Sequence, residues 1–255
     1  MRRFHLFEFE DQKWFPHFIR TCMVDYLRFM INTFDIYKPS FKILGELIKR
    51  TGERKIVELC AGGGGAVERI SEVLGAQVES ITLTDLYPNE DAFTFLSDKN
   101  PKIKFSLESV DVKNVPASYH GIRTIYSALH HFKPDDVKKI LQNAVDSNSP
   151  IAIFEAAERN PFHMLAILFS TYLSFLIFTL FIKPIKLGRL FFTYIIPAIP
   201  LFTTFDGIVS VLRMYKPNEL LALAKETDGK NYIWKSGIET DGLRRVTFLT
   251  GQPVK

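Results

Sequence analysis

Four consecutive glycines, Gly62 to Gly65, follow a short apolar segment that carries a single acid, Glu58. A glycine gives up more conformational freedom on folding than any other residue, so such a run is expected where the backbone must approach something closely. A nucleotide-like ligand would satisfy that requirement. Glu58 would then face a cationic or hydrogen-bond-donating part of the ligand rather than a pyrophosphate.

The common phosphate-binding patterns fit these glycines poorly. A G-x-G-x-x-G/A fingerprint that begins at Gly62 has Val67 in the third position, and only a shifted frame from Ala61 fits loosely. No Gly-Lys-Ser/Thr sequence follows, as a P-loop requires. An NAD-dependent oxidoreductase is therefore a less favoured alternative.

Two later residues could carry a proton during catalysis. His130 has a side chain that titrates near neutral pH, and Glu155 ends an apolar segment, so either could accept a proton from an oxygen nucleophile. His130 could equally be a structural histidine. Because the adjacent His130 and His131 would point in different directions and no neighbouring acid or cysteine completes a ligand set, we expect no metal.

Strand-like and helix-like segments alternate around these residues, which indicates a parallel sheet with helices on both faces. An amphipathic helix over 41–52 is expected to end at Gly52. The last two strands can pair in antiparallel fashion. Strands are expected over 55–60, 79–85, 102–109, 122–128, 150–156, 231–237 and 244–251, and helices over 66–75, 90–100, 134–145 and 216–229.

The glycine segment resembles motif I of the class I S-adenosylmethionine-dependent methyltransferases, in which an apolar strand and an acid precede Gly-x-Gly-x-Gly. Cys60 stands where the first glycine usually lies. The resemblance implies S-adenosylmethionine as cofactor and a Rossmann-like, doubly wound α/β fold of seven strands with the last strand antiparallel. It implies cofactor contacts from Glu58, Cys60, Ala61, Gly62, Gly63 and Gly64.

Three further segments resemble the family's later motifs. Asp85, followed by Leu86, stands where the family places an acid for the ribose hydroxyls. Asp111 and Val112 match the contacts to the adenine edge. Ser127, Ala128 and His130 would lie close to the transferred methyl group.

A very apolar stretch interrupts the α/β pattern. Met164 to Ile182 has no charged residue, and at helical rise it is nearly long enough to cross a bilayer. The strands on both sides should belong to one sheet, so the chain crosses the membrane either twice or not at all. A basic turn with Lys183, Lys186 and Arg189 would lie on the far side of a two-span hairpin, against the positive-inside tendency.

We therefore expect a helical hairpin that lies in, or dips into, the cytoplasmic leaflet. A two-span hairpin and a buried cap or dimer interface are the alternatives. The expected domains are an N-terminal helical lid (1–50), a methyltransferase domain (51–160 and 206–255) and the apolar, membrane-directed insertion (161–205). The residues expected to contact substrate or close over it are Trp14, Phe15, His131, Asp206 and Arg213.

The composition limits the remaining choices. In 255 residues the net charge is only +4, with 47% hydrophobic residues, so nucleic acid is not an expected partner. Cys22 and Cys60 cannot build a disulfide framework. The sequence thus predicts methyl transfer to a small hydrophobic or lipid-like acceptor on the cytoplasmic side of a membrane, and it leaves the oligomeric state open. A catalytically silent membrane-binding module with the same fold is the alternative.

Overall fold

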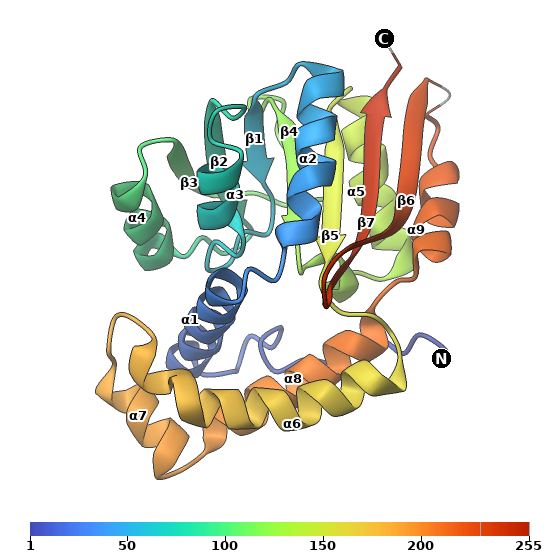
Figure 1. Cartoon of the computed structure of the whole chain (residues 1–255). Coiled ribbons are helices and arrows are strands. Elements are labelled where there is room, and N and C mark those ends of the chain that lie inside the picture. Colours follow the sequence, from blue (N-terminus) through green and yellow to red (C-terminus); the bar gives the residue numbers. More distant parts are fainter. Residues whose placement is uncertain (230, 255) are drawn as a thin grey trace.

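A computed structural model describes residues 1–229 and 231–254; Lys230 and Lys255, at positions inside the expected methyltransferase domain, lie outside the described residues. The described chain forms a seven-stranded sheet in the order β3-β2-β1-β4-β5-β7-β6 (Figure 1). The strands are β1 (Lys55–Glu58), β2 (Ser80–Asp85), β3 (Ile103–Ser109), β4 (Ile122–Tyr126), β5 (Ile151–Glu155), β6 (Tyr232–Asp241) and β7 (Arg244–Pro253).

The pairing confirms the expected fold. Strands β1 to β5 are parallel, whereas β7 runs antiparallel to both β5 and β6. Every residue of β4 and β5 is buried, as in parallel strands that are covered on both faces. The one basic residue in these two strands, Arg123, donates hydrogen bonds to Asn143 (2.8 Å) and Ser147 (3.0 Å) near the end of the covering helix.

Helices cover both faces of this sheet, and each face has its own hydrophobic cluster. The helix before β1 ends at Gly52, whose φ of 75° is left-handed and whose N–H donates to the carbonyl of Ile48, as expected. The sheet-covering helices are α2 (Lys38–Thr51), α3 (Val67–Val73), α4 (Glu90–Lys99), α5 (Pro134–Asp146) and α9 (Pro217–Lys225).

A separate layer of helices lies beyond the carboxyl ends of the parallel strands (Figure 1). Its hairpin confirms the expected apolar insertion, and its last helix runs without interruption through the domain boundary expected at 205/206. The layer packs on α1 (His17–Thr33), where Tyr26 stacks on Phe175 with ring centroids 4.1 Å apart. It consists of α6 (Pro161–Phe178), η2 (Thr179–Phe181), α7 (Leu187–Tyr194) and α8 (Ala198–Arg213).

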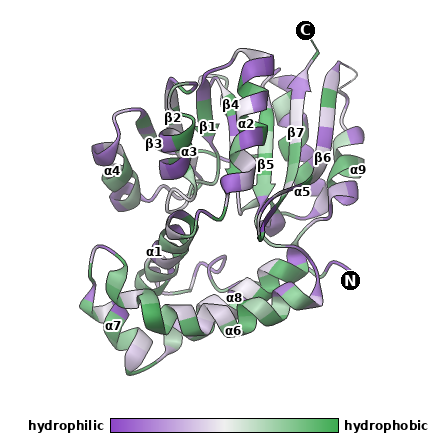
Figure 2. Cartoon of the chain, viewed as in Figure 1, coloured by the Kyte–Doolittle hydropathy of each residue, from purple (hydrophilic) through white to green (hydrophobic). Residues whose placement is uncertain are grey.

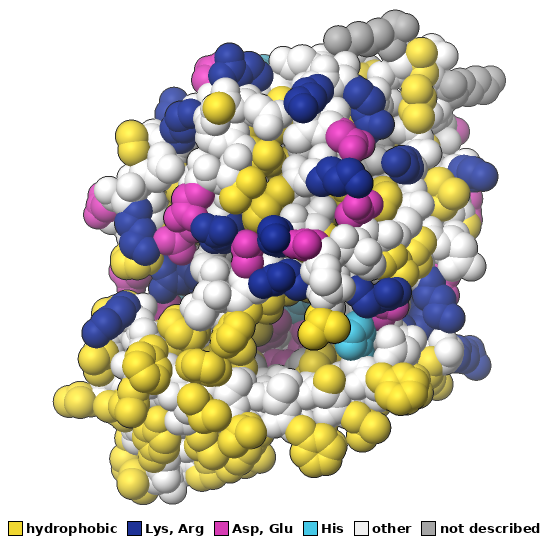
Figure 3. Space-filling model, viewed as in Figure 1, with side chains coloured by type: hydrophobic (Ala, Val, Ile, Leu, Met, Phe, Trp, Pro, Cys, Tyr) yellow, Lys and Arg dark blue, Asp and Glu magenta, His cyan; other side chains and the backbone are white. Residues whose placement is uncertain are grey.

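The outer side of this layer is strongly apolar. Helix α6 with η2, Pro161–Phe181, has the length and composition of a membrane span, but only 17% of its apolar window is buried in the protein. Helices α7 and α8 would pass the same test together, yet they are bent by 75°. Figure 2 shows the hydrophobic residues along these helices, and Figure 3 shows their side chains gathered on the surface below the charged sheet domain.

Candidate functional site

The loop after β1 has the backbone of a glycine loop even where the residue is not glycine. Cys60 adopts a φ of 56°, in the left-handed region that residues other than glycine rarely occupy. Gly62 and Gly64 are also left-handed, with φ of 52° and 90°. The cysteine at the first glycine position therefore leaves the shape of the turn intact.

The consecutive glycines serve different purposes. A Cβ on Gly63 would clash with Val24 of α1, and a Cβ on Gly64 would clash with Leu96 of α4, so both allow close packing. At Gly62 no heavy atom of the described residues lies within 4 Å of an added Cβ. The loop is thus open to a ligand at Gly62.

Asp85, at the end of β2, holds this loop in place. Its Oδ2 accepts the Gly62 N–H at 2.9 Å and its Oδ1 accepts the Tyr87 N–H at 2.8 Å. Burial raises the pKa of the carboxyl group, although these hydrogen bonds act in the opposite direction. Each carboxylate oxygen of Asp85 can still accept another hydrogen bond. The side chain of the next residue, Leu86, is about half exposed.

Glu58, at the end of β1, is almost fully buried, with 3% of its surface exposed. The Thr124 hydroxyl on the adjacent strand β4 donates to its Oε2. Burial raises the Glu58 pKa to about 7, more than the hydrogen bonds from Thr124 and the Tyr126 backbone lower it. Among the described residues no Lys, Arg or His forms an ion pair with this carboxyl group, so it could accept a cationic group from a ligand.

The expected adenine contacts lie after β3. The Asp111 Oδ1 accepts the Lys113 N–H at 2.9 Å, and its other oxygen lies 3.8 Å from the Lys113 ammonium. Val112 is 4% exposed and its side chain packs in the hydrophobic core. A ligand would therefore meet the backbone of Val112 and not its side chain.

Ser127 follows β4 with a φ of 51°, another left-handed residue other than glycine. Its N–H donates to the Phe154 carbonyl of β5 at 3.0 Å, and its hydroxyl is hydrogen-bonded to the Tyr37 hydroxyl. Tyr37 comes from the segment between α1 and α2 and is fully buried, and burial raises its pKa above the ordinary range. Ala128 next to Ser127 is partly exposed.

His130 and Glu155 form a buried pair: His130 lies in the short 3-10 helix η1 (Leu129–His131) that follows β4, and Glu155 is the last residue of the neighbouring strand β5. The imidazole Nδ1 lies 3.0 and 3.1 Å from the two Glu155 oxygens, and the His130 backbone N–H donates to Glu155 Oε1 at 3.0 Å. Their exposed fractions are only 3% and 2%. Since a carboxylate accepts hydrogen bonds, it fixes the proton on Nδ1 and leaves Nε2 as the basic nitrogen.

The N-terminal segment places acids beside this pair. His131 Nδ1 lies 2.9 Å from Asp11 Oδ1 and 3.3 Å from Glu8 Oε2. Arg213, at the end of α8, forms ion pairs with the same two acids, at 2.8 Å to Asp11 and 3.2 Å to Glu8. Burial lowers the His131 pKa, but the hydrogen bond that its imidazole donates to Asp11 and the charges of Glu8 and Glu10 outweigh burial and raise the pKa to about 10.

Asp206 anchors the same segment to α8. Its carboxylate accepts the backbone N–H groups of Phe9 (2.8 Å) and Glu10 (3.1 Å), and burial raises its pKa to about 7. Of the expected lid residues, the structure thus brings His131, Asp206 and Arg213 together. Phe15 is a core residue, and Trp14 lies on the surface with 68% exposed.

Several residues of the site carry no signal in the sequence. Glu8 is fully buried, and Arg3 donates to the backbone carbonyls of His130 (3.2 Å) and Phe132 (2.9 Å). Tyr37 and Thr124 complete the surroundings of Ser127 and Glu58. These partners come from distant positions, and no local pattern marks them.

One group in the described chain has the spacing of a metal site. Glu8, His130 and His131 each offer a ligand atom within 4.8 Å of the others. The guanidinium of Arg213 already lies 3.2 Å from Glu8 Oε1 and 3.3 Å from His131 Nδ1 and supplies a cation there. The expectation that no metal is used stays a prediction.

Known proteins resemble this chain in structure. No protein-family model and no curated protein matches its sequence. The plantazolicin methyltransferase BpumL, solved with SAH, has a TM-score of 0.59 at 14% identity, with 96% of this chain and 94% of that chain covered. An O-methyltransferase family protein from Burkholderia thailandensis gives 0.51 at 13% identity, with 89% of this chain and 57% of that chain covered.

The S-adenosylmethionine-dependent methyltransferase SibL, in its apo form, gives a TM-score of 0.52 at 11% identity, with 86% of this chain and 56% of that chain covered. The chain therefore spans little more than half of SibL and of the Burkholderia protein. At these identities the likeness concerns architecture, and it agrees with the strand order and the antiparallel β7 described above. The chain has the fold of the class I S-adenosylmethionine-dependent methyltransferases.

Proposed function

We propose that this protein transfers a methyl group from S-adenosylmethionine to an oxygen of a small hydrophobic or lipid-like acceptor at the cytoplasmic surface of a membrane. The observation that carries the proposal is the buried pair of His130 and Glu155 (3.0 Å) beside a glycine loop of the methyltransferase fold. Strand β4 lies between β1 and β5, so the glycine loop and the pair belong to neighbouring strand ends.

The residues around the loop fit the cofactor. Gly62 leaves room for a close approach, and the Asp85 oxygens retain acceptor capacity for ribose hydroxyls. Glu58 is a buried carboxyl group without an ion-pair partner in the described chain, suited to an amino group. When bound, S-adenosylmethionine supplies a methyl group already activated by its sulfonium.

The protein would then align the acceptor, exclude water and remove a proton. Glu155 accepts a hydrogen bond from the Nδ1–H of His130, and the free Nε2 would take the proton of an acceptor hydroxyl. Because Glu155 also accepts the backbone N–H of His130, the ring and its backbone are held by one carboxylate. Glu155 is accordingly a positioning residue and His130 the base.

The helical layer supports the membrane part of the proposal. Helix α8 turns Asp206 and Arg213 toward the protein, so we propose that it does not span the bilayer and that α6 lies on the lipid side. The apolar side chains exposed on this layer form a patch, and a patch of this kind on a protein surface marks a site of contact with a membrane or a partner. Large apolar residues exposed on this layer are Phe162, Leu165, Leu168, Phe169, Leu173, Ile177, Leu180, Phe181, Ile185, Leu187, Phe191, Tyr194, Ile195, Ile196, Leu201 and Phe205.

The first test is calorimetric titration of the detergent-purified protein with S-adenosylhomocysteine and, separately, with NAD. We expect the former to bind and NAD not to bind, and we expect Asp85→Ala to weaken binding while the protein remains folded by circular dichroism. Binding of NAD alone, or of neither ligand by folded protein, would refute the methyltransferase proposal.

The second test is methyl transfer from radiolabelled S-adenosylmethionine into a membrane lipid extract. His130→Ala should lower turnover by about 10²–10⁴-fold, the usual contribution of a general base, without loss of S-adenosylhomocysteine binding. The matched control is His120→Ala, because His120 is exposed in a loop. Equal turnover by the two variants would remove His130 from the mechanism.

A further inference from the structure

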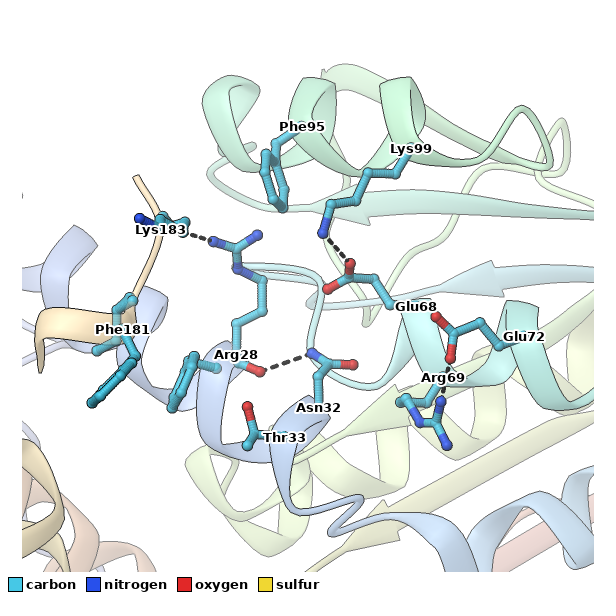
Figure 4. A pocket seen from close by; sticks show the side chains of 12 residues that line it. Arg28, Asn32, Thr33, Glu68, Arg69, Glu72, Phe95, Lys99, Phe181 and Lys183 are labelled. Atoms are coloured by element: carbon cyan, nitrogen blue, oxygen red, sulfur yellow. Dashed lines mark hydrogen bonds and ion pairs between the residues drawn. The ribbon is translucent and has the colours of Figure 1, made fainter. Parts of the chain in front are cut away.

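A pocket lies where the membrane-directed layer meets the sheet domain, and one of its lining residues, Asn32, donates to the carbonyl of Gly65 at the end of the glycine loop at 3.1 Å. Its volume is about 380 Å³, and its walls come from α1, α3, α4 and the turn that follows η2 (Figure 4). The residues that line it include Arg28, Phe95, Lys99, Phe181 and Lys183, and none is an expected cofactor or catalytic residue. The pocket therefore needs a role of its own.

Arg28, which lines the pocket, belongs to a neighbouring cluster with more positive than negative charge. Three cations form ion pairs with Asp25 of α1. Arg28 lies 3.7 Å from its Oδ1, and Lys186 and Arg189 lie 2.8 Å and 3.1 Å from its Oδ2. Arg28 is 8% exposed and Arg189 is fully buried. One carboxylate thus serves three cations, and buried cations are costly unless an anion balances them.

The three basic residues of the turn, Lys183, Lys186 and Arg189, are not equally available to an outside anion. Arg189 donates to the carbonyls of Ile182 and Pro184 and forms its ion pair with Asp25, so it organises the turn internally. Lys183 is exposed and, within the described part of the chain, has no ion-pair partner. Only Lys183 of the three basic residues is wholly available to an outside anion.

Two cations, Arg28 and Lys99, lie against one aromatic wall of this pocket. The Arg28 guanidinium lies 4.5 Å from the centroid of the Phe95 ring, and the Lys99 ammonium lies 4.2 Å from the same centroid. Figure 4 shows both groups beside that ring, with Lys183 on the turn whose carbonyl accepts a hydrogen bond from Arg28 at 3.3 Å. Lys99 also pairs with Glu68 at 2.8 Å, so the remaining positive charge centres on Arg28 and Lys183.

We propose that this pocket binds a phosphate group, and that at the membrane the group is the phosphate of an anionic phospholipid. Arg28 offers a planar guanidinium and Lys183 and Lys99 offer point charges, which is the donor set that suits a phosphate. The lipid source rests on the membrane association proposed above. It is favoured because Leu180, Phe181 and Ile185, on either side of Lys183, are each more than half exposed and could enter the acyl region.

Flotation with phosphatidylcholine vesicles, with and without phosphatidylglycerol, tests the lipid source on the full-length protein. We expect tighter binding to the anionic vesicles, and we expect Lys183→Gln and Lys99→Gln each to lower that binding by about fivefold, the usual effect of one basic residue near an anionic surface. Binding to neutral vesicles should not change. Lys49→Gln, an exposed lysine at the far end of α2, is the charge-matched control.

If the pocket variants lose no more anionic binding than Lys49→Gln, the lipid proposal is wrong. Calorimetry with inorganic phosphate, without vesicles, tests the soluble source: phosphate binding that Lys183→Gln and Lys99→Gln abolish supports the pocket as a phosphate site. Such binding without any preference for anionic vesicles would overturn the phospholipid assignment. S-adenosylhomocysteine titration of the same variants separates the two proposals, because it should be unchanged whatever the vesicles show.

Discussion

Glu58 allows a quantitative test of the site that does not depend on the identity of the acceptor. Its carboxyl group is 3% exposed, and burial raises its pKa from 4.5 to about 7. At 1.36 kcal/mol per pKa unit, this shift means that ionised Glu58 destabilises the folded state by about 3 kcal/mol. The Glu58→Gln variant cannot ionise, so it should escape this loss.

The sign of the pH dependence follows from proton binding. The folded state holds the Glu58 proton more tightly than the unfolded state, so this stabilising contribution is complete below pH 4.5. It is lost as the pH rises through about 7 and changes no further above that. We expect the unfolding free energy of Glu58→Gln minus that of the unchanged protein to rise by up to about 3 kcal/mol between pH 4.5 and pH 8.

Urea unfolding at several pH values measures this difference directly. Subtracting the unfolding free energy of the unchanged protein at each pH cancels the titration of all other groups. Glu46 is an exposed glutamate on α2, so Glu46→Gln is a control for which this difference should not vary with pH. A flat difference for Glu58→Gln as well would refute the reasoning. With saturating S-adenosylhomocysteine the pH dependence should shrink, because a ligand amino group beside Glu58 favours the ionised carboxylate.

Four further variants test the loop and the apolar layer. Cys60→Gly should raise the unfolding free energy by roughly 0.5–1 kcal/mol, because relief of left-handed strain exceeds the added chain entropy; a lower value in urea unfolding would show that the thiol contributes by packing. Gly63→Ala should cost about 1–3 kcal/mol through its clash with Val24. Gly62→Ala meets no neighbouring atom, but its φ of 52° is left-handed, so it should cost about 1–2 kcal/mol in thermal unfolding and, unlike Gly63→Ala, should also weaken S-adenosylhomocysteine binding in calorimetry. Phe162→Ser combined with Phe169→Ser, at positions 83% and 70% exposed, should weaken flotation with neutral vesicles and leave the unfolding free energy nearly unchanged; unchanged flotation would place the membrane contact elsewhere.

The sequence predicted the sheet because its signals are local. The apolar runs of β4 and β5 are continuous, as burial on both faces requires, and glycine ends α2 at the expected residue. The glycine loop was likewise predictable, since a run of glycines after an apolar strand is a local signal in the sequence. What the composition of the loop did not show is that Cys60 adopts the glycine conformation, which depends on the surrounding structure.

The parts that could not be predicted depend on residues far apart in the chain. Arg213 pairs with Asp11 across 202 positions, and Tyr37 meets Ser127 across 90. No periodicity or short motif relates such positions. The same holds for Arg189 of the basic turn, whose ion-pair partner, Asp25 of α1, lies 164 positions away in the sequence.

Helix α8 joins the membrane-directed layer to the catalytic face. Along its length, Ile199 packs in the cluster with Phe175 of α6, Asp206 holds the N-terminal segment, and Arg213 meets the acids beside His131. The Arg213 carbonyl also accepts a hydrogen bond from Arg3, which in turn donates to the carbonyl of His130. Removing the insertion would therefore do more than release an anchor: it would withdraw partners from the N-terminal segment that covers the His130 and Glu155 pair. The proposed membrane attachment and the shape of the candidate active site would accordingly depend on the same helix.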